Sequence, residues 1–184
     1  MTDNNNTRSL QRRDLTEHAV LNSRAFRDAL GLYASGITVI AGHDGDEPLG
    51  FTCQSFYSVS MDPPLISFSV MATSSTYPRI RSTGKFSVNV LSRAQQSVSN
   101  QFAQKGTDKW SGIAWSMSGG RNPVIEGTLT WLDCDIAAEH RAGDHIIVIG
   151  QVLAIGACDD HADEPLVYFR GGYRHLNTPL GSTG

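Results

Sequence analysis

The stretch from Gly50 to Thr76, GFTCQSFYSVSMDPPLISFSVMATSST, constrains the fold more than any other part of the chain. It holds two apolar strand-like runs, Gly50–Tyr57 and Leu65–Met71, on either side of the turn Met61–Pro64. Small hydroxyl residues follow or interrupt both runs: Thr52, Ser55, Ser58, Ser60, Ser67, Ser69, Ser74, Ser75 and Thr76. A strand pair with hydroxyls and free backbone N–H groups can hold a polar tail, most simply a phosphate. The alternative is that these residues are solvated edge positions and helix caps.

The length and charge of the chain limit the classes of protein to which it can belong. Its 184 residues suffice for one domain with a sizeable core. The formal net charge of −3 gives no excess of positive charge that would bind nucleic acid. No apolar run approaches the roughly 20 residues that span a bilayer. Because the polar N-terminus also lacks an apolar signal segment, we predict a cytoplasmic protein that does not enter a membrane.

The cysteines and acidic residues offer weak candidates for chemistry. Cys53, Cys134 and Cys158 are odd in number and widely spaced, which argues against a disulfide framework. Cys158 and His161 could donate two metal ligands, but nothing near them completes a tetrahedral set, so we predict no metal site. Asp133 and Asp135 share one side of a predicted strand, where they are either general acids or a solvated face.

The first part of the chain predicts a helix and a hairpin. Residues 1–20 are polar and predicted to be loosely ordered, ahead of a domain over residues 21–176 and a flexible tail over 177–184. The spacing of Phe26, Leu30 and Tyr33 predicts a helix over Arg24–Ser35 that exits through a left-handed Gly36. A strand over Ile37–Ala41 and the turn His43–Asp46 then predict a hairpin.

Strands dominate the rest of the chain. After the opening stretch we predict helices over Thr76–Ser82 and from Ser92 to Phe102, strands over Phe86–Leu91, Glu126–Glu139, His145–Ile155 and Leu166–Arg170, a long loop over Lys105–Arg121, and a bulge at Gly150. About seven short strands joined by tight turns favour a mainly β fold. We therefore expect a closed antiparallel barrel with helical attachments, because closure removes the edge strands.

Two further sites could face a ligand. His145 directly follows the Gly143-Asp144 turn, so it is either a residue at the barrel rim or an ordinary hairpin histidine. The segment Phe102–Trp110 (FAQKGTDKW) offers lysine charge and ring surface, or is a solvated loop with core anchors. The common dinucleotide, Walker, nucleophile-elbow and zinc-protease motifs are all missing.

The order of motifs is more informative than any single one. The series FRDALGLYASGITVI, GFTCQSFYSVSMDPPL, FSVNVL, AGDHIIVIGQV and LVYFRGGYRHL closely resembles the short-chain flavin reductases. These NAD(P)H:flavin oxidoreductases supply reduced flavin to two-component monooxygenases. The resemblance covers about Phe26 to Leu176 and implies a split β-barrel, a homodimer, and flavin bound near the dimer interface.

The resemblance also assigns candidate residues. It places the flavin ring and ribityl contacts on Thr52, Cys53, Gln54, Ser55 and Phe56, followed by Ser58 and Val59; the phosphate contacts on Thr73, Ser74 and Ser75, with Arg79 nearby; and the flavin tail against Phe102, Ala103, Lys105 and Gly106. It places Gly143, Asp144 and His145 at the nicotinamide, with Tyr173 near the same pocket and His145 as the catalytic residue.

The predicted function is therefore the transfer of hydride from NAD(P)H to FAD or FMN for a partner monooxygenase. The scarcity of arginines near the nicotinamide candidate favours NADH. One alternative is a split-barrel protein that binds flavin or haem without turnover, and another is a flavin-retaining oxidase of the pyridoxamine-phosphate oxidase type. We also expect the loop with Trp110 and Trp115 to wall the partner subunit's site.

Overall fold

The computed structural model describes residues 22–157, 164–174 and 176. Within these ranges, no helix is long and apolar enough to cross a membrane. The predicted N-terminal segment 1–20, the tail 177–184, and the candidate metal ligands Cys158 and His161 lie outside the described residues.

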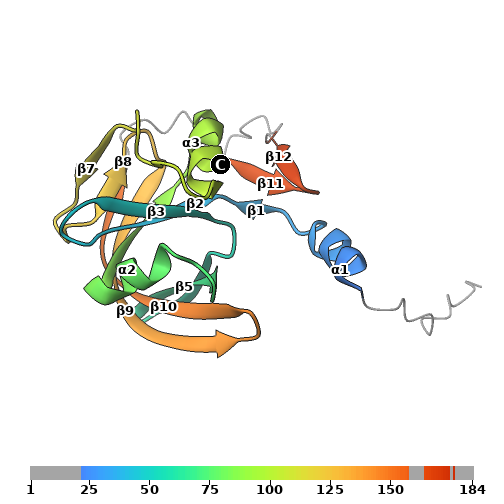
Figure 1. The fold of residues 1–184 in the computed structure, drawn as a ribbon, viewed down its shortest axis with the longest axis horizontal. Coiled ribbons are helices and arrows are strands. Elements are labelled where there is room, and N and C mark those ends of the chain that lie inside the picture. The colour runs from blue at the N-terminus through green and yellow to red at the C-terminus, as the bar shows by residue number, and fades with distance from the viewer. Residues whose placement is uncertain (1–21, 158–163, 175, 177–184) are drawn as a thin grey trace, which may run out of the picture.

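A seven-stranded sheet forms the body of the domain (Figure 1). Its strand order is β3-β2-β6-β9-β10-β5-β4 and each pairing is antiparallel. The strands are β2 (Thr38–His43), β3 (Pro48–Cys53), β4 (Tyr57–Met61), β5 (Pro64–Met71), β6 (Lys85–Val90), β9 (Thr130–Ala142) and β10 (His145–Ala157). This topology confirms the prediction of a mainly β, antiparallel fold.

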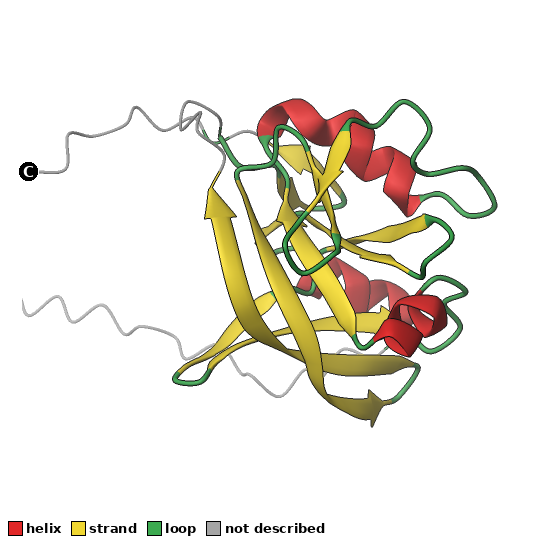
Figure 2. Ribbon diagram, turned by 90° about the vertical axis from the view of Figure 1, so that its left-hand side faces the viewer, coloured by secondary structure: helices red, strands yellow, loops and turns green. Residues whose placement is uncertain are grey.

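Shorter elements complete the described fold (Figure 2). A three-stranded sheet and a two-stranded hairpin accompany three α-helices and one 3₁₀ turn. Their bounds are β1 (Ser35–Gly36), β11 (Val167–Phe169), β12 (Gly172–Arg174), β7 (Trp115–Met117), β8 (Pro123–Ile125), α1 (Ser23–Leu30), α2 (Tyr77–Thr83), η1 (Arg93–Gln95) and α3 (Gln96–Ala103).

Strand β2 is buried on both faces because it separates two apolar clusters. Side chains alternate along a strand, so Ile40 enters one cluster while Val39 and Ala41 enter the other. The first cluster lies inside the curled sheet and includes Phe68, Phe86, Val88 and Val148; the second lies beneath α3 and includes Leu91, Phe102, Ile125 and Leu166.

The hydrogen-bonded ladder does not close into a complete barrel, because β3 and β4 are its two end strands. At the gap, Ser55 follows β3 and its hydroxyl lies against β5. Ser55 Oγ donates to the carbonyl oxygen of Ser69 over 3.0 Å and accepts from the Ser69 N–H over 2.9 Å. One side chain thus takes the place of a missing backbone bridge, and the barrel is split rather than closed.

The predicted helix over Arg24–Ser35 was too long. It ends at Leu30, and Gly36 belongs to β1 instead of forming a left-handed exit. Its apolar face is also not buried against the described residues, since 52% of Phe26 and 57% of Leu30 are exposed.

Three predicted strand boundaries also differ from the structure. The run Gly50–Tyr57 is interrupted between β3 and β4, where Ser55 bonds to β5. Strand β9 begins at Thr130 because Gly127, at φ 78°, turns the chain before it. The predicted last strand is the first half of the hairpin β11–β12. The bulge at Gly150 is confirmed by the shift of the β9–β10 register there.

Candidate active site

A cavity of about 830 Å³ opens beside the gap in the barrel. Four segments contribute much of its lining: the end of β3, the residues that precede α2, the end of α3 with the loop after it, and the start of β10. Its volume falls within the roughly 300–1,000 Å³ of small-molecule sites. The opening stretch of the sequence analysis supplies two of these four segments.

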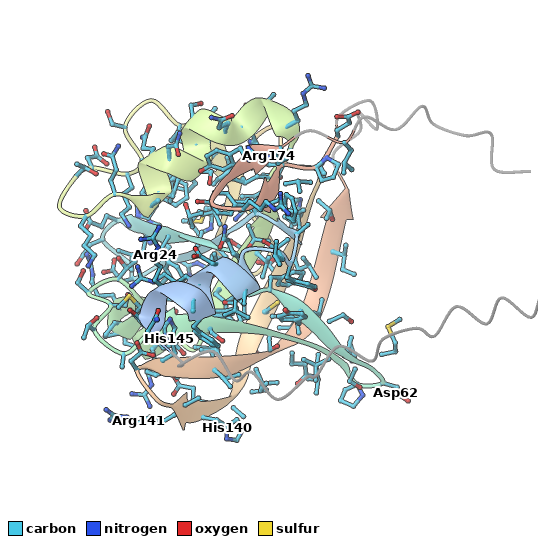
Figure 3. The ribbon with its side chains drawn as sticks, turned by 90° about the vertical axis from the view of Figure 1, so that its right-hand side faces the viewer. Arg24, Asp62, His140, Arg141, His145 and Arg174 are labelled. Atoms are coloured by element: carbon cyan, nitrogen blue, oxygen red, sulfur yellow. The ribbon has the colours of Figure 1, made fainter. Side chains whose placement is uncertain are left out.

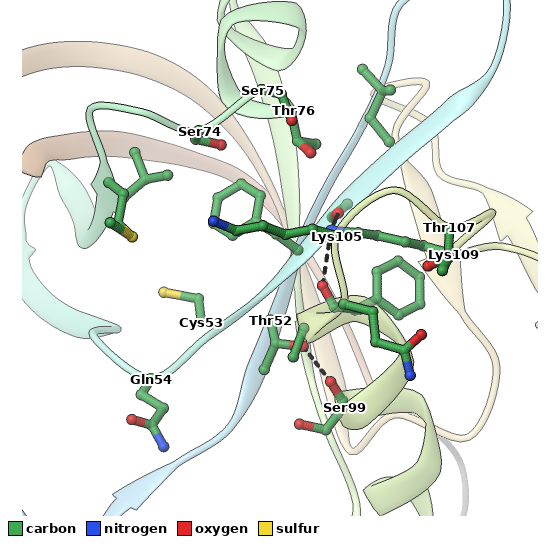
Figure 4. Close-up of a pocket in the computed structure, with 18 of the residues that line it drawn as sticks. Thr52, Cys53, Gln54, Ser74, Ser75, Thr76, Ser99, Lys105, Thr107 and Lys109 are labelled. Carbon is green, nitrogen blue, oxygen red and sulfur yellow. Dashed lines mark hydrogen bonds between the residues drawn. The ribbon is translucent and has the colours of Figure 1, made fainter.

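The end of β3 contributes Thr52, Cys53 and Gln54 to the cavity (Figure 4). The Thr52 hydroxyl donates to the backbone oxygen of Ser99 in α3 over 2.6 Å, which joins the strand to the helix. Cys53 is buried, and this burial raises the pKa of its thiol, so it is not an activated nucleophile. Gln54 is exposed.

The segment before α2 forms a second wall with Ser74 and Ser75 (Figure 4), and Thr73 also lines the cavity. Ser74 Oγ accepts a hydrogen bond from the Tyr77 N–H over 3.1 Å, so this serine does cap the first turn of α2. Ser75 is exposed at the cavity. The capping interpretation is therefore confirmed for Ser74, whereas a phosphate contact of the exposed Ser75 stays a prediction.

Tyr77 fixes this wall to the sheet. Its hydroxyl donates to Glu139 Oε1 of β9 over 2.5 Å, and Arg81 Nε donates to Glu139 Oε2 over 2.6 Å. Burial, followed by the bond to Glu139, raises the pKa of the Tyr77 hydroxyl well above its ordinary range. The phenol stays protonated and acts as a permanent donor.

Arg79 lines the cavity, but its guanidinium is already paired. Its Nε donates to Asp44 Oδ2 and its Nη1 to Glu47 Oε1, each over 2.8 Å. The Glu47 backbone N–H and then Arg79 lower the pKa of Asp44 to about 2, so this carboxylate is charged at neutral pH. Both acids come from the β2–β3 hairpin. Their negative charges compensate the positive charge of Arg79, which the sequence analysis placed near the flavin phosphate.

The end of α3 and the following loop form the wall opposite Ser74 and Ser75 (Figure 4). Phe102, Ala103, Lys105 and Gly106 all line the cavity, as the sequence predicted. Phe102 is fully buried, and the ring of Trp110 packs edge-on against it at 4.8 Å between centroids.

One residue of the tryptophan loop, Trp110, reaches the cavity of its own chain. Trp110 lines the cavity of this chain and contacts the Trp115 ring at 5.4 Å between centroids, while Trp115 lies 6.4 Å from the His43 ring. The expectation that this loop walls the partner's site stays a prediction; within the chain, its aromatic residues are held by packing.

His145 begins β10 and also lines the cavity. The two-residue turn before it has Gly143 at φ 61°, a conformation that favours glycine. The Asp144 backbone oxygen accepts from the Ala72 N–H over 2.9 Å, which ties the turn to the end of β5. The His145 side chain is 41% exposed, and Figure 3 shows it at the same end of the β9–β10 hairpin as His140 and Arg141.

Asp144 is the partner of the imidazole. His145 Nδ1 lies 2.7 Å from Asp144 Oδ1, and this hydrogen bond lowers the pKa of Asp144. Asp144 is therefore a carboxylate, which accepts the Nδ1 proton and fixes the orientation of the ring.

Tyr173 connects the small sheet to the cavity. Its hydroxyl lies 2.9 Å from both Ser99 Oγ and Asn100 Oδ1 of α3, and its ring packs edge-on against Tyr168. Both tyrosines line the cavity.

The cavity does not include all of the residues that the resemblance assigned. Phe56 packs against the first apolar cluster, and Ser58 and Val59 are exposed on β4. Gly143 and Asp144 precede His145 in the chain and do not line the cavity. The resemblance did not assign other lining residues, among them Ser99, Thr107, Asp108, Lys109, Trp110 and Tyr168. The charge and ring surface of FAQKGTDKW was the signal for two of them, whereas nothing in the sequence marked Ser99.

Asp133 has a structural role away from this cavity. It is 2% exposed and accepts from Ser118 Oγ, the Gly120 N–H and Asn122 Nδ2 over 2.8–3.1 Å. A buried carboxylate with three donors stabilises the β7–β8 hairpin. It forms neither the solvated face nor the general acid that the sequence had left open.

Comparisons with known proteins agree with this geometry. Residues 30–177 match the family model described as a flavin reductase like domain. The chain is 41% identical over 155 residues to the reductase subunit HsaB of a flavin-dependent monooxygenase from Mycobacterium tuberculosis, covering 84% of this chain and 83% of that one. It is 40% identical over 156 residues to a flavin reductase from Pseudomonas putida, covering 84% and 91%.

Solved structures have the same fold. Nitrilotriacetate monooxygenase component B from Mycobacterium thermoresistibile superposes with a TM-score of 0.81 at 37% identity, covering 86% of this chain and 90% of that one. The Streptomyces globisporus NADH:FAD oxidoreductase SgcE6, in complex with NAD and FAD fragments, gives 0.81 at 27% identity, covering 89% and 100%. The chain therefore belongs to the flavin reductase-like domain family.

Proposed function

We propose that this protein is an NADH-dependent flavin reductase that reduces FAD or FMN and supplies reduced flavin to a partner monooxygenase. The main support is that His145, the Thr52–Ser55 segment and the lysines after α3 line one cavity. The relatives named above are themselves reductases or reductase components. Its cytoplasmic location stays a prediction from the sequence.

The residues that line the cavity are suitable for a flavin. Hydroxyls, an amide and two ammonium groups offer donors for a polar tail, while Trp110, Tyr168 and Tyr173 offer ring surface. About 830 Å³ accommodates a ligand of this size class. When bound together, the nicotinamide and the flavin supply the chemistry, which is the transfer of a hydride from one ring to the other.

The protein's own part is to position the rings and exclude water. Asp144 holds the Nδ1 proton of His145, so Nε2 is the ring nitrogen left for a ligand. We propose that this imidazole orients the nicotinamide by stacking or by bonding its carboxamide. Thr52 and Ser55 bond to Ser99 and Ser69 and thus hold the flavin-binding edge of β3 in place. The buried thiol of Cys53 takes no part as a nucleophile.

Steady-state NADH oxidation tests this proposal. The absorbance of NADH is followed with FAD, FMN, riboflavin or no flavin, and with NADPH in place of NADH. We expect little oxidation without flavin, rapid oxidation with FAD or FMN, and a preference for NADH. A protein that binds flavin without consuming NADH would instead be a binding module.

We also propose a homodimer. At least half of each side chain is exposed for Phe26, Leu30 and Leu32 around α1, and for Val59 and Met61 of β4. The two groups meet where Tyr33 hydrogen-bonds Tyr57 and raises the pKa of its hydroxyl. An apolar surface of this extent on a monomer is typical of a protein interface.

Analytical ultracentrifugation tests the dimer. We expect a dimer at micromolar concentration, and we expect Val59→Asp to shift the equilibrium toward monomer because a carboxylate would then enter the interface. A wild-type monomer with full activity would contradict the proposal.

A further inference from the structure

The cationic groups of the cavity are not equivalent. Arg79, Lys105 and Lys109 all line it. The guanidinium of Arg79 is compensated by two carboxylates from the β2–β3 hairpin, as described above. The chain contains three lysines, and the third, Lys85, is exposed at the start of β6 and does not line the cavity. The two lysines after α3 are therefore the cations that remain to be explained.

Lys109 has neutral partners only. Its Nζ donates to the Phe102 carbonyl oxygen over 3.0 Å and to the Gly50 carbonyl oxygen over 3.2 Å. Within the described part of the chain, no carboxylate forms an ion pair with it. The side chain is half-buried, and this burial lowers the pKa of its ammonium group. An ammonium has three N–H donors, so one is left after the two carbonyls.

Lys109 is also held rigidly. Gln101 Nε2 donates to the backbone oxygens of Lys109 and Ser111 over 2.9 and 2.8 Å, and the next residue, Trp110, packs on Phe102. Lys105 lies instead on the exposed part of the loop, and its side chain extends across the cavity (Figure 4). The ammonium of Lys109 is thus fixed in place, and the ammonium of Lys105 reaches into the cavity from the same wall.

We propose that Lys109, assisted by Lys105, is the specificity-determining anion site that selects flavins bearing a phosphate over riboflavin. FMN and FAD both carry a phosphate at the end of the ribityl chain, and riboflavin ends there in a hydroxyl. A half-buried ammonium without a counter-ion gains most from an anion, because the anion offsets the cost of its desolvation. The proposal rests on the proposed function, since it concerns the flavin of that same site.

A purely structural role makes a different prediction. By joining the end of α3 to β3 through two carbonyls, Lys109 could stabilise the site without touching the ligand. Its loss would then weaken the binding of every flavin by a similar factor. An anion site predicts a loss confined to the flavins with a phosphate, so the ratio of affinities separates the two roles.

The experiment measures equilibrium binding of riboflavin, FMN and FAD without NADH, by the quenching of flavin fluorescence. Wild type is compared with Lys109→Met, which keeps the apolar stem, and with Lys109→Gln, whose amide can still donate to one carbonyl. Lys85→Met is the matched control. We expect both Lys109 variants to bind FMN and FAD about ten-fold more weakly, with riboflavin affinity within about two-fold of wild type.

Several results would overturn the proposal. They are an equal loss for all three flavins, no loss for any of them, and a wild type that binds riboflavin as tightly as FMN. If Lys109→Met does not fold, Lys109→Gln decides alone; if neither folds, the role is structural and the proposal is wrong. A wild type that binds phosphate-bearing flavins preferentially but does not oxidise NADH would contradict the proposed function and leave this subsite standing.

Discussion

Replacing Ser55 by alanine tests the account of how the split barrel is held together. The hydroxyl of Ser55 bonds to both backbone groups of Ser69, and the substitution removes both bonds. A typical intramolecular hydrogen bond contributes about 0.5–1.5 kcal/mol, which gives about 1–3 kcal/mol for the pair. Ser69 is half-buried and lines the cavity, so water can replace part of the loss. We therefore expect the free energy of unfolding to fall by about 1.5 kcal/mol.

Urea unfolding, followed by tryptophan fluorescence, measures this change. The midpoint should fall while the slope stays the same, and the melting temperature should drop by roughly 3–6 °C for a domain of this size. All proteins are compared at one concentration, because a dimer couples stability to concentration. The apparent KM for flavin should also rise several-fold, since Ser55 lines the cavity.

Ser58→Ala is the matched control. Ser58 is a serine three residues along the chain that is exposed on β4, so its replacement should change the stability by less than about 0.5 kcal/mol. If Ser55→Ala unfolds at the same urea concentration as Ser58→Ala, the hydroxyl bridge does not stabilise the fold and the reasoning is refuted.

Three further substitutions follow from the structure. His145→Ala should lower kcat/KM for NADH by roughly 10- to 100-fold, with flavin affinity within a few-fold of wild type; loss of flavin affinity alone would assign His145 to the flavin. Gly150→Ala should destabilise the protein by about 1–3 kcal/mol, because its Cβ would lie 2.4 Å from Phe86 Cζ, and an unchanged melting temperature would argue against this contact. Asp44 has a pKa of about 2, below its ordinary 3.8, so it stabilises the fold above about pH 4 and loses this effect as the pH falls toward 2. In urea titrations, the difference in the free energy of unfolding between wild type and Asp44→Asn should therefore shrink as the pH falls from about 4 toward 2. A difference that stays constant with pH would contradict the ion pair with Arg79.

The sequence predicted most of the sheet because its strands follow simple local rules. Hydrophobic runs bounded by Asp-Gly, Pro-Pro and Gly-Asp turns marked the hairpins, and Gly150 marked the bulge. The interruption between β3 and β4 was not predictable in this way, since a serine hydroxyl that bonds to β5 looks like any polar position of a strand.

The helix α1 was misjudged for a different reason. Amphipathic spacing indicates an apolar face but does not say what covers it, and no described part of the chain buries Phe26 or Leu30. The same pattern is compatible with a core helix and with an interface helix.

The sequence predicted which backbone segments line the candidate site. It did not predict which charged side chains pair with residues far away in the chain. Resemblance located the end of β3, the Ser74–Ser75 wall and His145, all of which line the cavity. It could not show that Arg79 pairs with Asp44, 35 residues away, or that Lys109 has no acidic partner among the described residues. The charge available to a ligand depends on such contacts rather than on residue type.

An anaerobic turnover experiment tests the central claim most directly. A small amount of the protein is mixed with NADH and a large molar excess of free FAD or FMN, and the loss of NADH and of oxidised flavin absorbance are followed together. We predict one flavin reduced for each NADH consumed, over many turnovers per protein, because reduced flavin leaves the cavity for its partner enzyme. Reduction that stops after one flavin per subunit, or NADH loss without flavin reduction, would contradict the account.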